Sequence, residues 1–316
     1  MDATQIGRQY TGTMRRAVLL YNPRSGRANH HHTIERMALA LRNQGLEVHA
    51  VPTESADSMG SQAAQLADTT DTLFACGGDG TLHGVLQGLA HHPTCTLGVI
   101  PMGSANVFAR HLKLSLDPVE AALQQLAWKP RLLPLGHITY TTSSGERSRY
   151  FLALAGAGPD GALVYRMLAT GKHRMGRAMY YLRSAFLFAT TRFSTFTVIT
   201  VLGELQVISA MAVRVADLGG LFSPLIPRAE PHLPYLDLTL TLPPAPLTLP
   251  LWFVSSWARL RRLNRFCTVA AVDSFQCSTG LTAPVQVQAD GEHLGQTPMA
   301  VTLVPGAIRI LYPPNL

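Results

Sequence analysis

The sequence predicts an α/β fold in which a parallel sheet covered by helices is followed by a second, β-rich domain. From residue 16, apolar runs such as Ala17–Tyr21 alternate with helical patterns such as the face formed by Ile34, Met37, Ala38 and Leu41. After about residue 135, short β-rich runs are separated by proline and glycine. Strands that alternate with helices build parallel sheets, whereas runs of successive strands build antiparallel ones.

The first domain is expected to hold four parallel strands joined by helices. After Ala17–Tyr21 and its helix, the expected elements are the strand Leu46–Val51, the helix Ser61–Ala67, the strand Leu73–Ala75, the helix carrying Leu82, Val85, Leu86 and Leu89, and the strand Leu97–Ile100. Ligands of such sheets bind beyond the carboxyl ends of the strands. We therefore expect the functional residues at that edge.

The second domain is expected to be a mostly antiparallel β structure with one helical insertion, roughly Leu163–Thr190. Its expected strands are Tyr150–Ala155, Phe196–Val201, Val207–Val215, Leu236–Leu242, Val269–Phe275, Val285–Ala289 and Ile308–Tyr312. We expect domains over residues 1–135 and 136–304, with residues 305–316 as a candidate segment that rejoins the first domain.

Composition narrows the class of protein. With 316 residues, 47% hydrophobic and 14% charged, the chain is expected to form folded domains with substantial cores. The net charge of +7 indicates an anionic partner, which a nucleotide, an acidic membrane or a nucleic acid would satisfy. The four cysteines lack metal-ligand spacing, so we expect reduced thiols and a cytoplasmic protein. No signal peptide is expected, and prolines within Leu238–Trp257 argue against a transmembrane helix.

A glycine turn follows the third strand and carries the strongest functional signal. It consists of Gly77, Gly78, Asp79, Gly80 and Thr81. Glycines allow the backbone to approach a ligand closely, and the free amides at a helix N-terminus favour an anion such as phosphate. A carboxylate beside a phosphate is repelled unless it holds a metal, binds a sugar hydroxyl or takes a proton. The turn therefore suggests both phosphate binding and chemistry.

Two other turns end neighbouring strands. The first contains Asn22, Ser25 and Gly26, and the other contains Gly103, Ser104 and Asn106. Their polar groups are suited to the sugar or phosphates of a nucleotide, although ordinary strand-to-helix turns have similar compositions.

Two acidic turns mark the second domain. Gly156–Gly161 matches the G-x-G-x-x-G pattern, but no acid follows at the distance that a dinucleotide site requires, so Asp160 is the residue of interest. Asp290-Gly291 is typical of a hairpin turn, and Glu292 gains functional interest if that hairpin faces the site.

An aromatic and basic segment follows in the second domain. Trp252, Phe253 and Trp257 precede Arg259 and neighbouring arginines, a combination that suits a lipid headgroup region and equally a packed core with a solvated basic face.

The ordered set of motifs resembles the diacylglycerol kinase catalytic-domain family, which includes bacterial lipid kinases and the sphingosine and ceramide kinases. The resemblance rests on Asn22–Gly26, Gly77–Thr81, Pro101–Asn106 with the following Phe-Ala-Arg, the turn at Asp160 and Asp290–Glu292. The basic segment Lys172–Tyr181 is also similar.

This resemblance implies a Rossmann-like domain, a β-sandwich-like domain and an ATP site in the cleft between them. It further implies transfer of the γ-phosphoryl group to a lipid hydroxyl in phospholipid metabolism. Thr53, Gly77–His83 and Ser104 would bind the nucleotide, and Glu292 would accept the proton. Asp79 and Asp160 would hold Mg²⁺ with the phosphates or orient the lipid hydroxyl.

The chain departs from the family pattern at two places. Val107 stands where many bacterial members have an aspartate, and His232-Leu233-Pro234 replaces an Asp-Asp-Gly associated with a structural Mg²⁺ site. Two alternatives therefore remain: an inactive lipid- or nucleotide-binding protein of the same fold, and an NAD kinase. The expected partners are a lipid substrate and a peripheral anionic membrane surface, without nucleic acid, and an exposed sheet edge makes a homodimer a further candidate.

Overall fold

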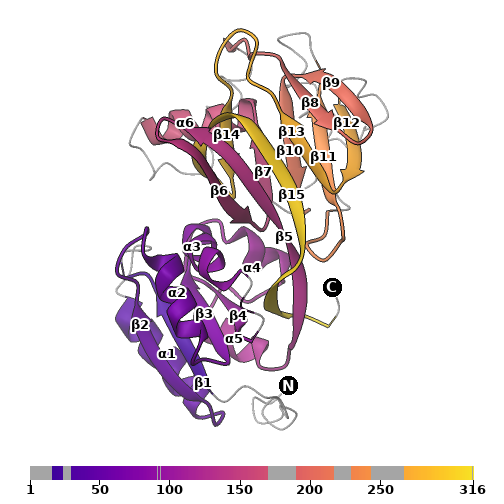
Figure 1. Ribbon diagram of the computed structural model, residues 1–316. Coiled ribbons are helices and arrows are strands. Elements are labelled where there is room, and N and C mark those ends of the chain that lie inside the picture. Colours follow the sequence, from indigo (N-terminus) through magenta and orange to yellow (C-terminus); the bar gives the residue numbers. More distant parts are fainter. Residues whose placement is uncertain are drawn as a thin grey trace. The chain divides into compact units, whose positions relative to one another are not determined.

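The computed structural model describes residues 16–23, 30–90, 92, 94–169, 190–216, 229–242, 267–314 and 316 (Figure 1). The chain divides into two compact units. Unit 1 comprises Met1–Leu135 and Pro305–Leu316, and unit 2 comprises Gly136–Val304. Two long strands, β5 (Lys129–Thr142) and β15 (Glu292–Tyr312), pass from one unit into the other.

Unit 1 contains the expected parallel sheet, with strands in the order β4-β3-β1-β2. Its strands are β1 (Arg16–Tyr21), β2 (Glu47–Pro52), β3 (Thr72–Gly77) and β4 (Thr96–Pro101). The end of β15 continues the sheet beside β4, where Ile310 pairs with Leu97 in parallel. Every residue of β3 and β4 is buried, as expected for strands whose two faces are both covered by helices.

The helices of unit 1 form two groups. They are α1 (His30–Arg42), α2 (Met59–Ala67), α3 (Asp79–Leu89), α4 (Val107–His111) and α5 (Pro118–Gln125). Crossovers between parallel strands are right-handed, so the strand order decides which face each helix covers. The chain steps from β1 to β2 in one direction along the sheet and from β2 to β3 and β4 in the other, which puts α1 on one face and α2 and α3 on the other. In agreement, α1 packs with α5, and α2 packs with α3 (Figure 1). A Cβ on Gly88 would lie 1.9 Å from the Gly60 carbonyl oxygen, so α2 and α3 pack backbone to backbone.

Unit 2 is mostly antiparallel, as predicted. Its main path is β12-β11-β10-β7-β14-β15, and β13 pairs with both β15 and β8. The elements are β6 (Gly145–Phe151), β7 (Leu154–Ala157), α6 (Pro159–Ala169), β8 (Phe196–Thr200), β9 (Gly203–Val207), β10 (Ser209–Val213), β11 (Leu236–Thr241), β12 (Cys267–Val272), β13 (Ser274–Cys277) and β14 (Gln286–Ala289). Aromatic and aliphatic side chains such as Phe151, Phe196 and Phe275 fill its core. Within the described part of the chain, no helix is long and apolar enough to cross a membrane.

Some strand boundaries predicted from the sequence were wrong. The expected strand Tyr150–Ala155 is two strands, because β6 ends at Phe151 and β7 begins at Leu154. The backbone amides between them bind a carboxylate instead of a neighbouring strand. The run Val269–Phe275 is likewise divided between β12 and β13. The expected strand Ile308–Tyr312 is the end of the 21-residue strand β15.

Arg214 is a buried cation that joins several parts of unit 2. Its side chain is 1% exposed, its amide donates to the Ala153 carbonyl, and its guanidinium donates to the Pro231 carbonyl. Burial lowers the pKa of the Arg214 guanidinium to about 10, while the charges of Asp290 and Asp237 raise it. The turn after Pro231 is the His232-Leu233-Pro234 segment that departs from the family pattern. An arginine therefore supplies positive charge next to this segment.

We expect Arg214→Met to lower the free energy of unfolding of unit 2 by roughly 3–5 kcal/mol, because it leaves nearby carboxylates without their buried cation. Arg192→Met removes an exposed arginine of the same unit and should change it by less than about 0.5 kcal/mol. Urea denaturation followed by circular dichroism measures both variants. If both substitutions change the free energy of unfolding by the same small amount, Arg214 stabilises the fold no more than an exposed arginine does.

Candidate functional site

The carboxyl ends of the parallel strands carry the predicted nucleotide-binding residues of unit 1. The registers align Tyr21 with Pro52 and with Cys76, and Gly77 with Pro101, so the four strands end at the same edge. Just beyond this edge, Thr53 donates its amide to the Tyr21 carbonyl at 2.8 Å. The structure thus collects Asn22, Thr53, Gly77–Thr81 and Gly103–Asn106 at one edge of one sheet. Ser25 and Gly26 lie outside the described residues.

The glycine turns after β3 and β4 touch through their backbones. A Cβ added to Gly103 would lie 2.4 Å from the Gly78 Cα, well inside van der Waals contact. A Cβ added to Gly77 would lie 2.2 Å from the Thr81 hydroxyl oxygen, so the Thr81 side chain occupies that space. Glycine is therefore required at Gly77 and Gly103 by packing within unit 1. Gly78 is the extended residue preceding α3, and its carbonyl accepts the amides of Thr81 and Leu82.

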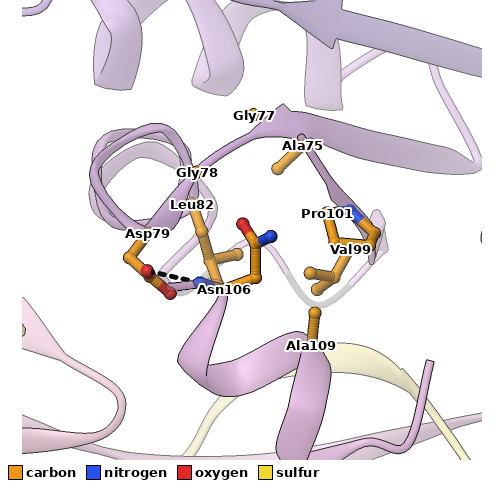
Figure 2. Close-up of a pocket in the computed structure, with 9 residues that line it drawn as sticks. All are labelled: Ala75, Gly77, Gly78, Asp79, Leu82, Val99, Pro101, Asn106 and Ala109. Atoms are coloured by element: carbon orange, nitrogen blue, oxygen red, sulfur yellow. Dashed lines mark hydrogen bonds between the residues drawn. The ribbon is translucent and has the colours of Figure 1, made fainter. Parts of the chain in front are cut away.

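Asp79 fastens these two turns together. Its Oδ2 accepts the Asn106 amide at 2.9 Å and its Oδ1 accepts the Val107 amide at 2.7 Å, at the start of α4. The carboxylate thus satisfies two amides that begin a helix. Figure 2 shows Asp79 from one turn facing Asn106 from the other. Asp79 therefore has a structural role besides any chemical one.

Asn106 holds the second turn in shape. Its backbone is left-handed, with φ of 50°, a conformation that asparagine tolerates better than most residues. Its side-chain oxygen accepts the Gly103 amide at 2.9 Å, and its side-chain nitrogen donates to the Gly103 carbonyl at 2.9 Å. Both ends of the amide are therefore used to close the loop on Gly103.

A small pocket lies beside the two turns. Figure 2 shows the side chains that line it. The lining residues are Ala75, Gly77, Gly78, Asp79, Leu82, Val99, Pro101, Asn106 and Ala109. The pocket is mainly apolar, with the Asp79 carboxylate and the Asn106 amide as its polar side chains. Gly80 and Ser104 are exposed and do not line this pocket.

In unit 2, the Asp290-Gly291 turn determines where β15 begins. Both residues have positive φ, 47° and 83°, as a two-residue type I′ hairpin turn requires. The Asp290 carboxylate accepts the amides of Leu152, Ala153 and Leu154, each at 2.9 Å. These three hydrogen bonds fix the turn against the gap between β6 and β7. Glu292 follows the turn as the first residue of β15.

Glu292 is paired with an arginine that the sequence did not single out. Arg149 of β6 donates from Nη1 to Glu292 Oε2 at 2.8 Å. The two residues are 143 positions apart in the chain. Only the pairing of β6 through β5 and the return of β15 bring them together, and sequence spacing carries no signal of that contact.

Asp160 lies in the first turn of α6. Gln288 donates from Nε2 to Asp160 Oδ2 at 3.0 Å, whereas Asp160 Oδ1 is buried without a hydrogen bond. Burial raises the pKa of Asp160 to about 6, while the hydrogen bond from Gln288 lowers it. Gln288 also accepts the Gly291 amide at 3.1 Å, so it connects Asp160 to the turn before Glu292.

The glycines around Asp160 are explained by packing. A Cβ on Gly156 would lie 2.6 Å from the Asp160 carboxylate, and one on Gly161 would lie 2.2 Å from the Gln286 carbonyl oxygen. Gly158 has a φ of 117°, which favours glycine. The glycines of the G-x-G-x-x-G pattern thus allow α6 to pack closely against the sheet. This packing explains the pattern without a bound dinucleotide.

Two carboxylates, those of Asp79 and Asp160, are the metal ligands predicted from the resemblance. Across the described ranges, no group of three or more His, Cys, Asp or Glu side chains is arranged to hold a metal ion. Asp79 and Asp160 belong to different units. Each Asp79 oxygen accepts one backbone amide, from Asn106 and from Val107.

Two segments noted in the sequence fall outside the described residues. They are the basic segment Lys172–Tyr181 and the aromatic and basic segment that begins at Trp252 and includes Arg259.

Comparison with known proteins identifies the family. The family model for the diacylglycerol kinase catalytic domain matches residues 16–138, and that for the YegS C-terminal NAD kinase beta sandwich-like domain matches residues 153–312. The diacylglycerol kinase of Staphylococcus saprophyticus is 34% identical over 171 residues, covering 54% of this chain and 53% of that protein. The Staphylococcus aureus MRSA252 diacylglycerol kinase is 32% identical over 171 residues, covering 54% of this chain and 52% of its own. These matches thus span about half the length of the curated relatives.

Solved structures share the fold. A diacylglycerol kinase from Bacillus anthracis has a TM-score of 0.69 at 18% identity, over 96% of this chain and 99% of that chain. Yeast NADH kinase in complex with NADH has a TM-score of 0.53 at 10% identity, over 96% and 85% respectively. The two family models follow each other in order along the motifs described above, and the chain belongs to the diacylglycerol kinase catalytic-domain family.

Proposed function

We propose that this protein transfers the γ-phosphoryl group of ATP to a hydroxyl group of a lipid at a membrane surface. The observation that carries the proposal is the contact between the two glycine turns, Gly78 against Gly103, with Asp79 fastening them at the carboxyl ends of parallel strands. Glycine turns at this edge are a general solution for binding phosphates. The names of the curated relatives support a lipid as acceptor.

The turns would hold the nucleotide through backbone groups. The 11-residue helix α3 begins at Asp79, and the N-terminus of a helix favours an anion. Gly78 and Gly80 carry no side chains, which lets a phosphate approach the backbone there. Asn22, Thr53 and Ser104 lie at the same edge and would contact the rest of the nucleotide. Phosphoryl transfer depends mainly on positioning and charge neutralisation, which such a site provides.

Mg²⁺ would accompany the phosphates. Mg²⁺ commonly uses one or two carboxylates, with phosphate oxygens and water completing its shell. The carboxylates of Asp79 and Asp160 would be its protein ligands. The ion would neutralise charge on the transferring group. Val107, which replaces a family acid, supplies its backbone amide to Asp79 and no carboxylate.

Glu292 would accept the proton from the lipid hydroxyl. A positioned base contributes on the order of 10²–10⁴-fold to such reactions. Asp160, linked through Gln288 to the turn before Glu292, would orient the acceptor hydroxyl. Both acids are held in unit 2 by the same hairpin.

The basic charge supports action at an anionic membrane. The chain carries a net charge of +7, which attracts it to acidic headgroups. We accordingly place the protein in the cytoplasm, peripherally bound to the membrane, where ATP and lipid are both available.

NAD is the competing acceptor. The family model that matches residues 153–312 is named for an NAD kinase beta sandwich-like domain. Yeast NADH kinase shares the fold. An NAD kinase would not require vesicles or micelles, so dependence on a lipid surface separates the two functions.

We expect Asp79→Asn to lower kcat for ATP-dependent lipid phosphorylation by roughly 100-fold or more. The substitution replaces one of the two oxygens that hold the turns together by an NH2 group, which cannot accept a hydrogen bond from a backbone amide. Asp117→Asn is the matched control, since Asp117 also accepts two helix-initiating amides, from Val119 and Glu120. It should change stability by less than about 0.5 kcal/mol, because asparagine caps helices about as well as aspartate, and it should leave kcat within about twofold. Equal activities of the two variants would exclude the proposed role of Asp79.

We expect Gly103→Ala to weaken ATP binding by about tenfold or more, because its methyl group would force the two turns apart. Isothermal titration calorimetry with a nonhydrolysable ATP analogue measures the affinity, and thermal unfolding reports whether the fold survives. A folded variant with unchanged affinity would contradict binding at these turns.

A further inference from the structure

We propose that Arg149 is a positioning residue that holds the Glu292 carboxylate in the orientation needed for proton transfer. The inference rests on the phosphoryl-transfer function proposed above. It concerns a residue that carries no recognisable motif in the sequence and becomes evident only through its contact with Glu292.

The contact is well formed. Arg149 Nη1 lies 2.8 Å from Glu292 Oε2, a normal distance for a charge-assisted hydrogen bond between a guanidinium and a carboxylate. The side chains are 28% and 38% exposed, so solvent reaches both but neither extends freely into it. The contact engages one oxygen of the carboxylate. A carboxylate has about four lone-pair sites, so a single hydrogen bond from Arg149 does not by itself prevent proton transfer to Glu292.

The backbones of both residues are fixed without this ion pair. Arg149 faces Ile138 across the β5–β6 ladder. Glu292 faces Ala289 across the β14–β15 ladder, and the preceding turn is held by the Asp290 carboxylate. What the ladders leave undetermined is the direction of the Glu292 side chain, which has several rotatable bonds. Arg149 therefore acts on the carboxylate and not on the course of the chain.

A role in stability alone does not account for the pair. Partly exposed ion pairs typically contribute about 0–1 kcal/mol to folding. By contrast, misplacing a catalytic group by about 1 Å can cost about 10²-fold in rate. The same contact therefore matters little for folding and much for the proposed reaction.

The surroundings provide a matched control. Burial raises the pKa of Tyr140, Arg149 and Arg147 lower it, and Glu292 raises it, so all three charged groups act on this region. Arg147 is two residues from Arg149 on the same strand and hence on the same face. Its guanidinium donates to the Ser144 hydroxyl at 3.4 Å. Arg147→Met thus removes one positive charge from the same strand and face without removing the partner of Glu292.

The test is a double-mutant cycle measured as kcat and KM for ATP in neutral mixed micelles, with the lipid acceptor in excess. We expect Arg149→Met to lower kcat by between about 10- and 100-fold with little change in KM for ATP. In the Glu292→Gln background, the same change should alter kcat by less than about twofold, because its effect passes through the carboxylate. Arg149→Lys should recover part of the rate. Arg147→Met should leave kcat within about twofold of the unmodified protein.

Three results would overturn the proposal. They are an equal loss from Arg149→Met in both backgrounds, a loss confined to KM for ATP, and an equal loss from Arg147→Met. The first two would indicate that Arg149 contacts the nucleotide directly. Full activity of Glu292→Gln would also overturn it, but by removing the proposed proton acceptor itself, which separates that failure from a failure of the positioning role. Thermal unfolding of each variant verifies that Arg149→Lys and Arg149→Met remain folded.

Discussion

The close contact between Gly78 and Gly103 is the constraint on which the nucleotide-facing edge of unit 1 depends. The turns after β3 and β4 approach until no Cβ fits on Gly103. At that separation, Asp79 at the start of one helix reaches the amides that begin the next. The buried, parallel strands set the position of both turns, and the carboxylate fastens them. Apolar strand packing thereby places the N-terminus of α3 and the backbones of two glycine turns at this edge, which suits a phosphate-binding site.

Unit 2 has a comparable organising group in Asp290. A single carboxylate binds three consecutive amides, interrupts what would otherwise be one strand, and fixes the turn from which Glu292 emerges. Around it, Gln288 extends to Asp160, Arg149 binds Glu292, and Arg214 places a buried positive charge near Asp290 itself. The acids expected from the family resemblance therefore lie within one hydrogen-bonded framework in this unit. Arg214 adds positive charge near the segment where the family pattern of acids is lost.

The sequence was sufficient to predict the elements whose signals are local. The alternation of apolar runs and helical faces predicted the parallel sheet, and the glycine turns at its strand ends predicted which residues gather there. Glycine is needed at Gly77 and Gly103 for a reason visible only in three dimensions, since the clash involves a neighbouring turn. The break at Leu152 and Ala153 was missed because its cause, Asp290, is more than a hundred residues away. Arg149 and Gln288 were missed for the same reason, because strand residues without a motif acquire a role only through long-range pairing.

Transfer of phosphate from ATP to a lipid hydroxyl is the function that we propose for this family member. The most direct measurement is transfer of labelled γ-phosphate from ATP to diacylglycerol, monoacylglycerol, sphingosine, ceramide and phosphatidylglycerol in mixed micelles. NAD in solution serves as the competing acceptor, and each assay is run with Mg²⁺ and with chelator. We expect a labelled lipid that forms only with Mg²⁺ and no labelled NADP. A labelled NADP product, or no labelled lipid from protein that still binds ATP, would contradict the proposed function.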